Sequence, residues 1–127
     1  MRFTPRASAE RGEPVDPAHF TGAATSVPLH RTEAAHPVSV SLVRFPAGVR
    51  NHWHRHGGGQ LLHAVEGQGW VQSRGAEPRR LRPGDSVSTA PGEEHWHGAG
   101  PGEAFAHVAV TIGEVEFLEP SPQPPPA

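Results

Sequence analysis

Apolar residues in this chain occur in short segments, where they alternate with polar residues. Between Gln60 and Glu66, Leu62 and Ala64 fall on one face of an extended chain and His63 falls on the other. A period of two is typical of β-strands that bury one face. The pattern predicts strands at Thr25–Arg31, Val38–Phe45, Arg50–His56, Gln60–Glu66, Gly69–Arg74, Arg79–Arg82, Asp85–Thr89, Glu94–His97 and Glu103–Ile112.

Glycine and proline separate these segments. The predicted turns lie at Pro46–Gly48, Gly67–Gly69, Arg82–Gly84, Pro91–Gly92 and Gly98–Gly102. Short strands divided by such turns are typical of an antiparallel sandwich or barrel. No segment shows a helical stripe, and we expect Val115–Leu118 to form one helical turn at most. The sequence therefore predicts an all-β fold.

The length of 127 residues is that of one domain. Residues 1–18 are polar, with prolines at positions 5, 14 and 17, and predict a flexible N-terminal arm. The folded body is expected over residues 19–118. Residues 119–127 form a proline-rich tail, which we expect to be extended, polyproline-like and solvated.

Composition and charge exclude several classes of function. The net charge is -2 and the arginines are scattered, so no basic face for nucleic acid is expected. No apolar run approaches the ~20 residues of a membrane span and no signal peptide is evident, which predicts a cytoplasmic protein that does not bind membranes. The absence of cysteine excludes disulfides, thiolate ligands and cysteine nucleophiles.

The stretch from Asn51 to Gln60 is the most informative part of the sequence. In an extended chain its alternating histidines share one face, and neighbouring imidazoles about 6.5 to 7 Å apart along the strand can reach one ion. On a helix, residues two apart diverge and could not chelate together. His95 and His97 repeat the alternation and are expected to complete a metal site; the residues concerned are His52, His54, His56, Gln60, His95 and His97.

The same alternation makes a prediction about assembly. If His54 and His95 face inward, their neighbours Trp53 and Trp96 face outward. A small all-β monomer is not expected to expose two tryptophans beside the apolar segment Val38–Phe45. We therefore expect the outer face to be covered by a further layer or by a second subunit, with a homodimer as the favoured arrangement.

Two motifs resemble those of the cupin superfamily. Gly48 to Gln60, with Glu66-Gly67, is similar to the first cupin motif, and Gly84-Asp85 with Pro91-Gly92-x-x-His95 is similar to the second. The resemblance covers Phe20 to Leu118 and implies a single-domain jelly-roll β-barrel with a metal at its centre. Small cupins that read W-H-x-H-x-x-G-Q are the most similar group, and it includes manganese-dependent hydroxynitrile lyases.

The resemblance implies particular roles. It gives the metal ligands as His54, His56, Gln60 and His95, and it implies one divalent transition metal, with manganese first and iron, nickel, cobalt or zinc as alternatives. His97 and His107 match further pocket histidines of the group, and we expect one of them to act as general base. We expect His52 to lie at the rim of the site. The last strand ends Val110-Thr111, where the lyase-like members offer a longer glutamine to the pocket.

Three functional hypotheses remain open from the sequence. The first is a lyase that combines a Lewis-acidic metal with a histidine base and acts on a small molecule; a hydroxynitrile lyase-like activity is its leading form. The second is a dioxygenase that uses iron and oxygen. The third is a sensor or binding module that grips a metabolite through the metal without turnover.

Overall fold

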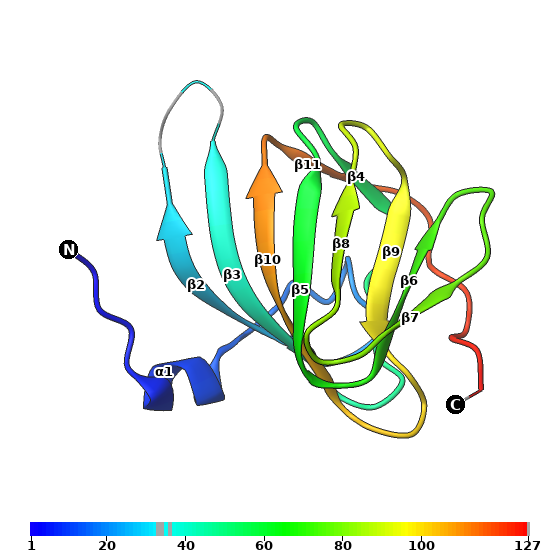
Figure 1. The fold of residues 1–127 in the computed structure, drawn as a ribbon, viewed down its shortest axis with the longest axis horizontal. Helices are drawn as coiled ribbons and strands as arrows, with labels where there is room; N and C mark the ends of the chain where they lie inside the picture. The colour runs from blue at the N-terminus through cyan, green and yellow to red at the C-terminus, as the bar shows by residue number, and fades with distance from the viewer. Residues whose placement is uncertain (33–34, 36, 127) are drawn as a thin grey trace.

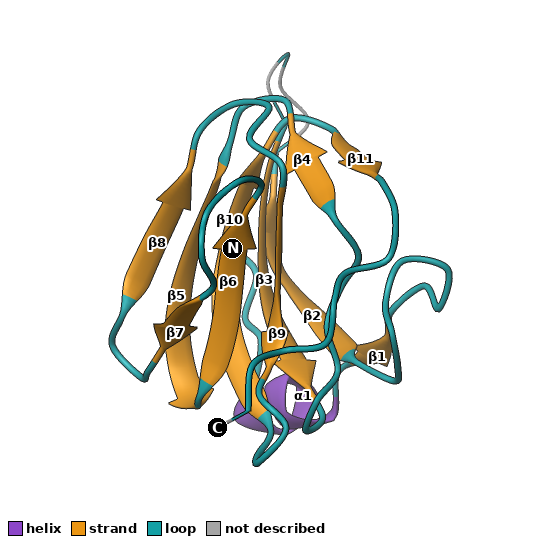
Figure 2. Cartoon of the chain, turned by 90° about the vertical axis from the view of Figure 1, so that its right-hand side faces the viewer, coloured by secondary structure: helices purple, strands orange, loops and turns teal. Residues whose placement is uncertain are grey.

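The computed structural model describes residues 1–32, 35 and 37–126, which fold into two antiparallel sheets that face each other (Figures 1 and 2). The helix and strands have the following bounds: α1 Arg6–Arg11, β1 Glu13–Pro14, β2 Thr25–Arg31, β3 Val38–Phe45, β4 His54–His56, β5 Gln60–Gly67, β6 Gly69–Ser73, β7 Arg79–Leu81, β8 Ser86–Thr89, β9 His95–Ala99, β10 Phe105–Ile112 and β11 Val115–Phe117. The fold is all-β, as the strand pattern predicts, and its two sheets form the jelly roll that the resemblance implies.

The larger sheet has the strand order β1-β2-β3-β10-β5-β8. The register places Val43 opposite His107, and His107 opposite Ala64 on the other side. Because directly paired residues point to the same face, this row and its alternate neighbours face the interior. The smaller sheet, β11-β4-β9-β6-β7, closes the other side of the barrel.

The apolar core fills one end of the barrel. Phe45 and Phe105 are essentially unexposed and their ring centroids lie 6.3 Å apart. Gly67 closes the β5–β6 turn with φ 67°, where a Cβ atom would collide with the carbonyl oxygen of Ala104. The other core members are Ala24, Ala64, Val71, Leu81 and Ala99. Buried histidines adjoin this core directly: the ring centroid of His107 lies 5.5 Å from that of Phe45.

The strand prediction matches the bounds of β2 and β3, but not those of β4. The segment Arg50–His56 was expected to be one strand, and only His54–His56 forms it. Residues 50 and 51 instead form isolated bridges with Gly98 and Phe20. The chain therefore enters the site from a loop, which places Asn51 beside β9.

Both termini contain elements that the sequence did not predict. Residues 6–11 form α1, and β1 pairs with β2 at the edge of the larger sheet. The expected helical turn at Val115–Leu118 is wrong: residues 115–117 form β11, which pairs with β4. Backbone pairing with β4 satisfies the polar groups of this segment, and an isolated helical turn could not do so as fully.

The segment 115–121, here called the C-terminal strap, begins as β11, the edge strand of the smaller sheet, and continues beside Trp53. The backbone of Leu118 donates to Trp53 O, and Trp53 N donates to Glu119 O. Buried Arg50 donates to both Oγ and O of Ser121. Ser121 is only 7% exposed, so the expectation of a wholly solvated tail is wrong at this residue.

The burial of both tryptophans corrects the premise that their side chains would be exposed in a single chain. Trp53 is 7% exposed and Trp96 is 0% exposed within the single chain. The Arg74 guanidinium lies over the Trp53 ring, and Trp96 Nε1 donates to Gln72 Oε1. A second subunit is not needed to cover them. No helix among the described residues is both long and apolar enough to cross a membrane.

Candidate metal centre

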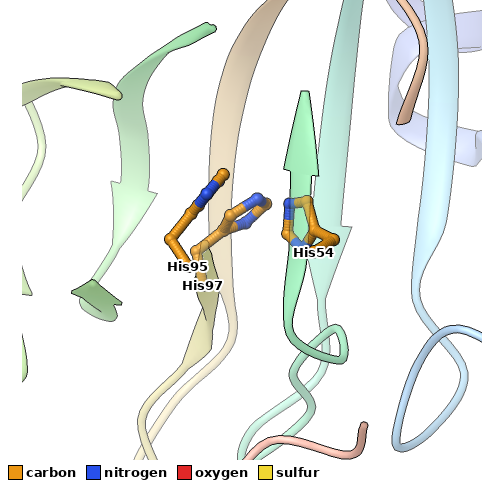
Figure 3. Close-up of side chains that lie close together, drawn as sticks. All are labelled: His54, His95 and His97. Atoms are coloured by element: carbon orange, nitrogen blue, oxygen red, sulfur yellow. The ribbon is translucent and has the colours of Figure 1, made fainter. Parts of the chain in front are cut away.

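The histidines singled out by the sequence converge from three strands. His54 and His56 lie on β4, His95 and His97 on β9, and His107 on β10. The register places His54 directly opposite His95. One ligand atom each of His54, His95 and His97 lies within 4.8 Å of the others, and Figure 3 shows these rings pointing toward one another.

Two of these rings are oriented by backbone carbonyl groups. His54 Nδ1 lies 2.8 Å from His52 O, and His95 Nδ1 lies 3.0 Å from Glu93 O. Each Nδ1 must carry its proton to donate there, which leaves the lone pair on Nε2 for a ligand. A ring nitrogen that donates to a carbonyl is the arrangement that metal-binding histidines usually have.

His56 and Gln60 lie beside this pair. The ring centroid of His56 is 5.0 Å from that of His54 and 5.5 Å from that of His95. Both ring nitrogens of His56 are buried without a hydrogen-bond partner in the part of the chain that the structure describes. Gln60 Oε1 lies 3.0 Å from His95 Nε2, while its amide nitrogen donates to Thr111 Oγ1.

His97 and His107 form a hydrogen-bonded pair deeper in the barrel. His107 Nε2 lies 3.0 Å from His97 Nδ1. Asn51 accepts from the backbone N–H of His97 through Oδ1, and its amide nitrogen lies 3.0 Å from His97 Nε2. Sequence reasoning missed the contact of Asn51 with His97, and the only available signal was a polar residue directly before the histidine run.

Burial keeps these imidazoles neutral. Desolvation is the largest cause that lowers the pKa of His54 and His97 well below the usual value, and neighbouring histidines add to it. Desolvation also lowers the pKa of His56 and of His107 to about 4. The pKa of His95 is lowered for the same reason. Neutral imidazoles are the form that binds metals and accepts protons.

The predicted site residues therefore occupy one region, but the positions of His97 and His52 differ in detail from the prediction. His97, expected as a general base, belongs to the geometric cluster with His54 and His95. His52 contributes its backbone carbonyl to His54 while its own side chain is half-buried. Its pKa is lowered by desolvation, with smaller contributions from His19 and Arg50. The contact of His52 with the cluster is thus made by its backbone carbonyl, which orients the His54 ring.

A cavity of about 320 Å³ adjoins the histidines. Its walls combine imidazoles with small hydroxyl side chains and apolar residues, and no Asp, Glu, Lys or Arg among the described residues lines it. Val115 and Phe117 of the C-terminal strap form part of the wall. Phe117 of β11 stacks on His19 with ring centroids 3.8 Å apart, so the loop before β2 packs against the strap.

The donor set fits a divalent transition metal. Free Nε2 lone pairs on His54 and His95, the unpartnered nitrogens of His56 and the amide oxygen of Gln60 give nitrogen and oxygen donors without thiolate. Such donors suit manganese, iron, cobalt, nickel, copper and zinc, and ligand type does not choose among them. All are neutral, so a bound ion would keep its full charge for a substrate.

A two-sheet barrel with histidines facing its interior defines a recognisable class of protein. The family model described as "Cupin domain" matches residues 41–112, which is more than half of the chain. The chain belongs to the cupin family. The resemblance seen in its two motifs is thereby confirmed.

Individual relatives agree with this assignment. The chain is 41% identical over 91 residues to a protein named (R)-mandelonitrile lyase from Granulicella tundricola, a match that covers 72% of this chain and 70% of the relative. Among solved structures, a cupin-like protein from Thermotoga maritima superposes with a TM-score of 0.82 at 36% identity, covering 87% of this chain and 86% of that one.

An acetylacetone dioxygenase from Acinetobacter johnsonii shares the fold at a lower level of identity. It has a TM-score of 0.75 and 18% identity, covering 94% of this chain and 79% of the other. At that identity the match concerns the fold alone, because one fold hosts many chemistries.

Proposed function

We propose that the protein is a metal-dependent lyase that cleaves a small, uncharged hydroxynitrile to a carbonyl compound and cyanide. The observation that carries the proposal is the buried His97–His107 pair beside the histidine cluster, in a cavity without charged side chains. The relative named (R)-mandelonitrile lyase, at 41% identity, supports the same activity.

The proposed metal ligands are His54, His56, Gln60 and His95, with manganese as the first candidate metal. When bound, the metal supplies Lewis-acid polarisation of a substrate oxygen. The carbonyl groups of His52 and Glu93 fix two ligand rings, and Thr111 fixes the amide of Gln60. Such fixed orientation lets the donors hold an ion without reorganising.

His97 and His107 manage the proton in this proposal. A ring nitrogen of the pair accepts the substrate hydroxyl proton while the bond to the nitrile carbon breaks. The electron pair of that bond leaves with cyanide, and the carbonyl group forms. The Nε2–Nδ1 hydrogen bond of 3.0 Å lets the two rings share the proton, which cyanide takes up afterwards.

The decisive experiment is metal analysis by mass spectrometry followed by a substrate panel with and without oxygen. Cleavage of racemic mandelonitrile that does not consume oxygen is the expected result. Oxygen uptake with an iron-loaded protein would contradict the proposal in favour of a dioxygenase. Tight ligand binding without turnover would instead identify a binding or sensor module.

The variant His54→Ala tests the metal centre separately from the reaction. We expect it to lose metal while keeping its fold, because His54 lies opposite His95 at the centre of the cluster. The matched control is His63→Ala, which changes an exposed histidine on the outer face of the larger sheet. If the His54 variant retained its metal, the ligand assignment would be wrong.

We also propose that the chain assembles as a homodimer through the outer face of the larger sheet. The row Val40–Val110–Leu61 runs across β3, β10 and β5, and Leu61 is 42% exposed. Ile112 and Val65, at 37% and 38% exposed, extend this apolar area. An apolar face of this kind supports a protein contact.

A further inference from the structure

Strand β3 carries its apolar and polar residues on the reverse of the expected faces. Val38, Val40 and Leu42 point outward, whereas Ser39 and Ser41 line the cavity. The inner face of a barrel strand is ordinarily apolar, since hydroxyl groups out of water cost free energy when they lack a partner. The presence of two serines on the inner face of β3 therefore points to a use for their hydroxyl groups in the cavity.

Neither serine uses its hydroxyl within the described part of the chain. Among residues 1–32, 35 and 37–126, the side chains of Ser39 and Ser41 make no hydrogen bond. Both are half-buried and both face the cavity. Their donors and acceptors are therefore available to a bound molecule.

The register fixes where the serines lie relative to the histidine cluster. Ser39 pairs with Thr111, and Thr111 pairs with Gln60 across the next strand. Two strand spacings separate Ser39 from Gln60, which is roughly 9 to 10 Å between backbones. Ser41 lies next to Ala109, whose small side chain leaves the space between the walls open.

We propose that Ser39 and Ser41 form a second polar subsite, which binds the polar substituent of an uncharged substrate whose own oxygen lies at the histidine cluster. The substrate class is a compact neutral alcohol or carbonyl compound with an adjacent hydrogen-bonding group and an apolar body. Phe20, Val43 and Phe117 offer the apolar walls. A pocket with a few placed polar groups fixes the orientation of its ligand in this way.

The absence of charged lining residues makes the subsite one for neutral groups. A carboxylate or ammonium substituent at the serines would find no opposite charge among the described cavity residues, and burying it there would be unfavourable. A serine hydroxyl can donate to a nitrile, a carbonyl or an amide oxygen, and it can also accept from an amide N–H. The inference rests on the proposed function only in placing the substrate oxygen at the histidines.

The test compares two stable benzylic alcohols that differ at the proposed subsite. Mandelamide carries an amide beside its hydroxyl group, and 1-phenylethanol carries a methyl group there. Their dissociation constants are measured by calorimetry on the protein with and without Mn²⁺. We expect wild-type protein to prefer mandelamide by about tenfold, the effect of one to two hydrogen bonds.

The double variant Ser39→Ala/Ser41→Ala should lose that preference while binding 1-phenylethanol and Mn²⁺ as the wild type does. Ser88→Ala, at an exposed position on the outer face, is the matched control and should change nothing. A preference that is absent in the wild type, or that survives in the double variant, would overturn the proposal. Failure to cleave mandelonitrile would contradict the lyase function and leave this comparison intact.

Discussion

His107 Nε2 lies 3.0 Å from His97 Nδ1, and both rings are buried in the barrel. Two neutral imidazoles in contact can share one proton, but neither can hold a charge cheaply in this environment. His97 also belongs to the cluster with His54 and His95, so it is a member of both the candidate metal cluster and the hydrogen-bonded pair. Its role is therefore the most informative one to test.

The variant His97→Gln should lose mandelonitrile cleavage by about 100-fold or more, the usual contribution of a general base, and keep its metal. Glutamine preserves a polar side chain of similar reach in contact with Asn51. Initial rates and metal content are measured on the same preparation. Loss of metal in proportion to activity would show that His97 is a ligand.

His56 is a proposed metal ligand, so its replacement should affect metal binding. Its two nitrogens are buried without partners in the described structure, so its one lone pair is available to a metal while no hydrogen bond orients the ring. We expect His56→Ala to weaken Mn²⁺ binding by at least about tenfold, as loss of one donor from four should. Titration of the metal-free protein with Mn²⁺ measures this. If the His56 variant bound Mn²⁺ as tightly as the wild type and the His97 variant lost its metal, His97 would be the ligand in place of His56.

The amide of Gln60 provides a third test. Its nitrogen donates to Thr111 Oγ1 at 2.9 Å, which turns Oε1 toward His95. Thr111→Val keeps the shape of the side chain and removes the acceptor, so Mn²⁺ affinity should fall by about 10- to 100-fold. Thr111→Ser should restore it. If the valine variant binds Mn²⁺ as well as the wild type, Thr111 does not orient the amide.

Strand periodicity predicted much of this architecture because the side-chain alternation is local. The bounds of β2 and β3 and the convergence of His54 with His95 follow from it. The reversed faces of β3 could not be read in the same way. Val38–Phe45 is apolar at so many positions that its inner face is decided by pairing with β10, a long-range contact.

The terminal segments were the least predictable for a similar reason. β11 forms because β4 offers its backbone edge, and Ser121 is buried because Arg50 reaches it across the chain. Neither partner is near in sequence. The burial of Trp53 and Trp96 also depends on such contacts, which is why alternation alone predicted exposed faces for them.

The lowered pKa values predict how the stability of the metal-free protein depends on pH. The pKa of His107 is about 4 in the folded protein, against an ordinary value of 6.5. Between these values the unfolded chain binds a proton that the folded chain does not. Stability contributed by the neutral ring is therefore complete above pH 6.5 and is lost as the pH falls toward 4.

The expected slope is about 1.4 kcal/mol per pH unit for each such proton, and His56 adds to it in the same direction. Urea unfolding of the metal-free protein at several pH values measures the slope. His107→Gln should reduce this slope by the contribution of about one proton. The reduction is expected whether or not the variant is less stable at pH 7. A wild-type free energy of unfolding that is constant from pH 6.5 to 4.5 would contradict the prediction.

The proposed homodimer is tested on the outer face of the larger sheet. Val110 pairs with Val40 on one side and with Leu61 on the other, so it lies near the centre of the apolar area. Light scattering at micromolar concentration should give twice the chain mass of 13.5 kDa for the wild type. Val110→Glu places a charge on this face, which burial in a dimer would desolvate, and should yield monomers that keep their metal.

Ala76→Glu adds the same charge in the exposed β6–β7 turn and should leave the dimer unchanged. A monomeric wild-type protein would contradict the homodimer, and a dimeric Val110 variant would show that the chains meet elsewhere.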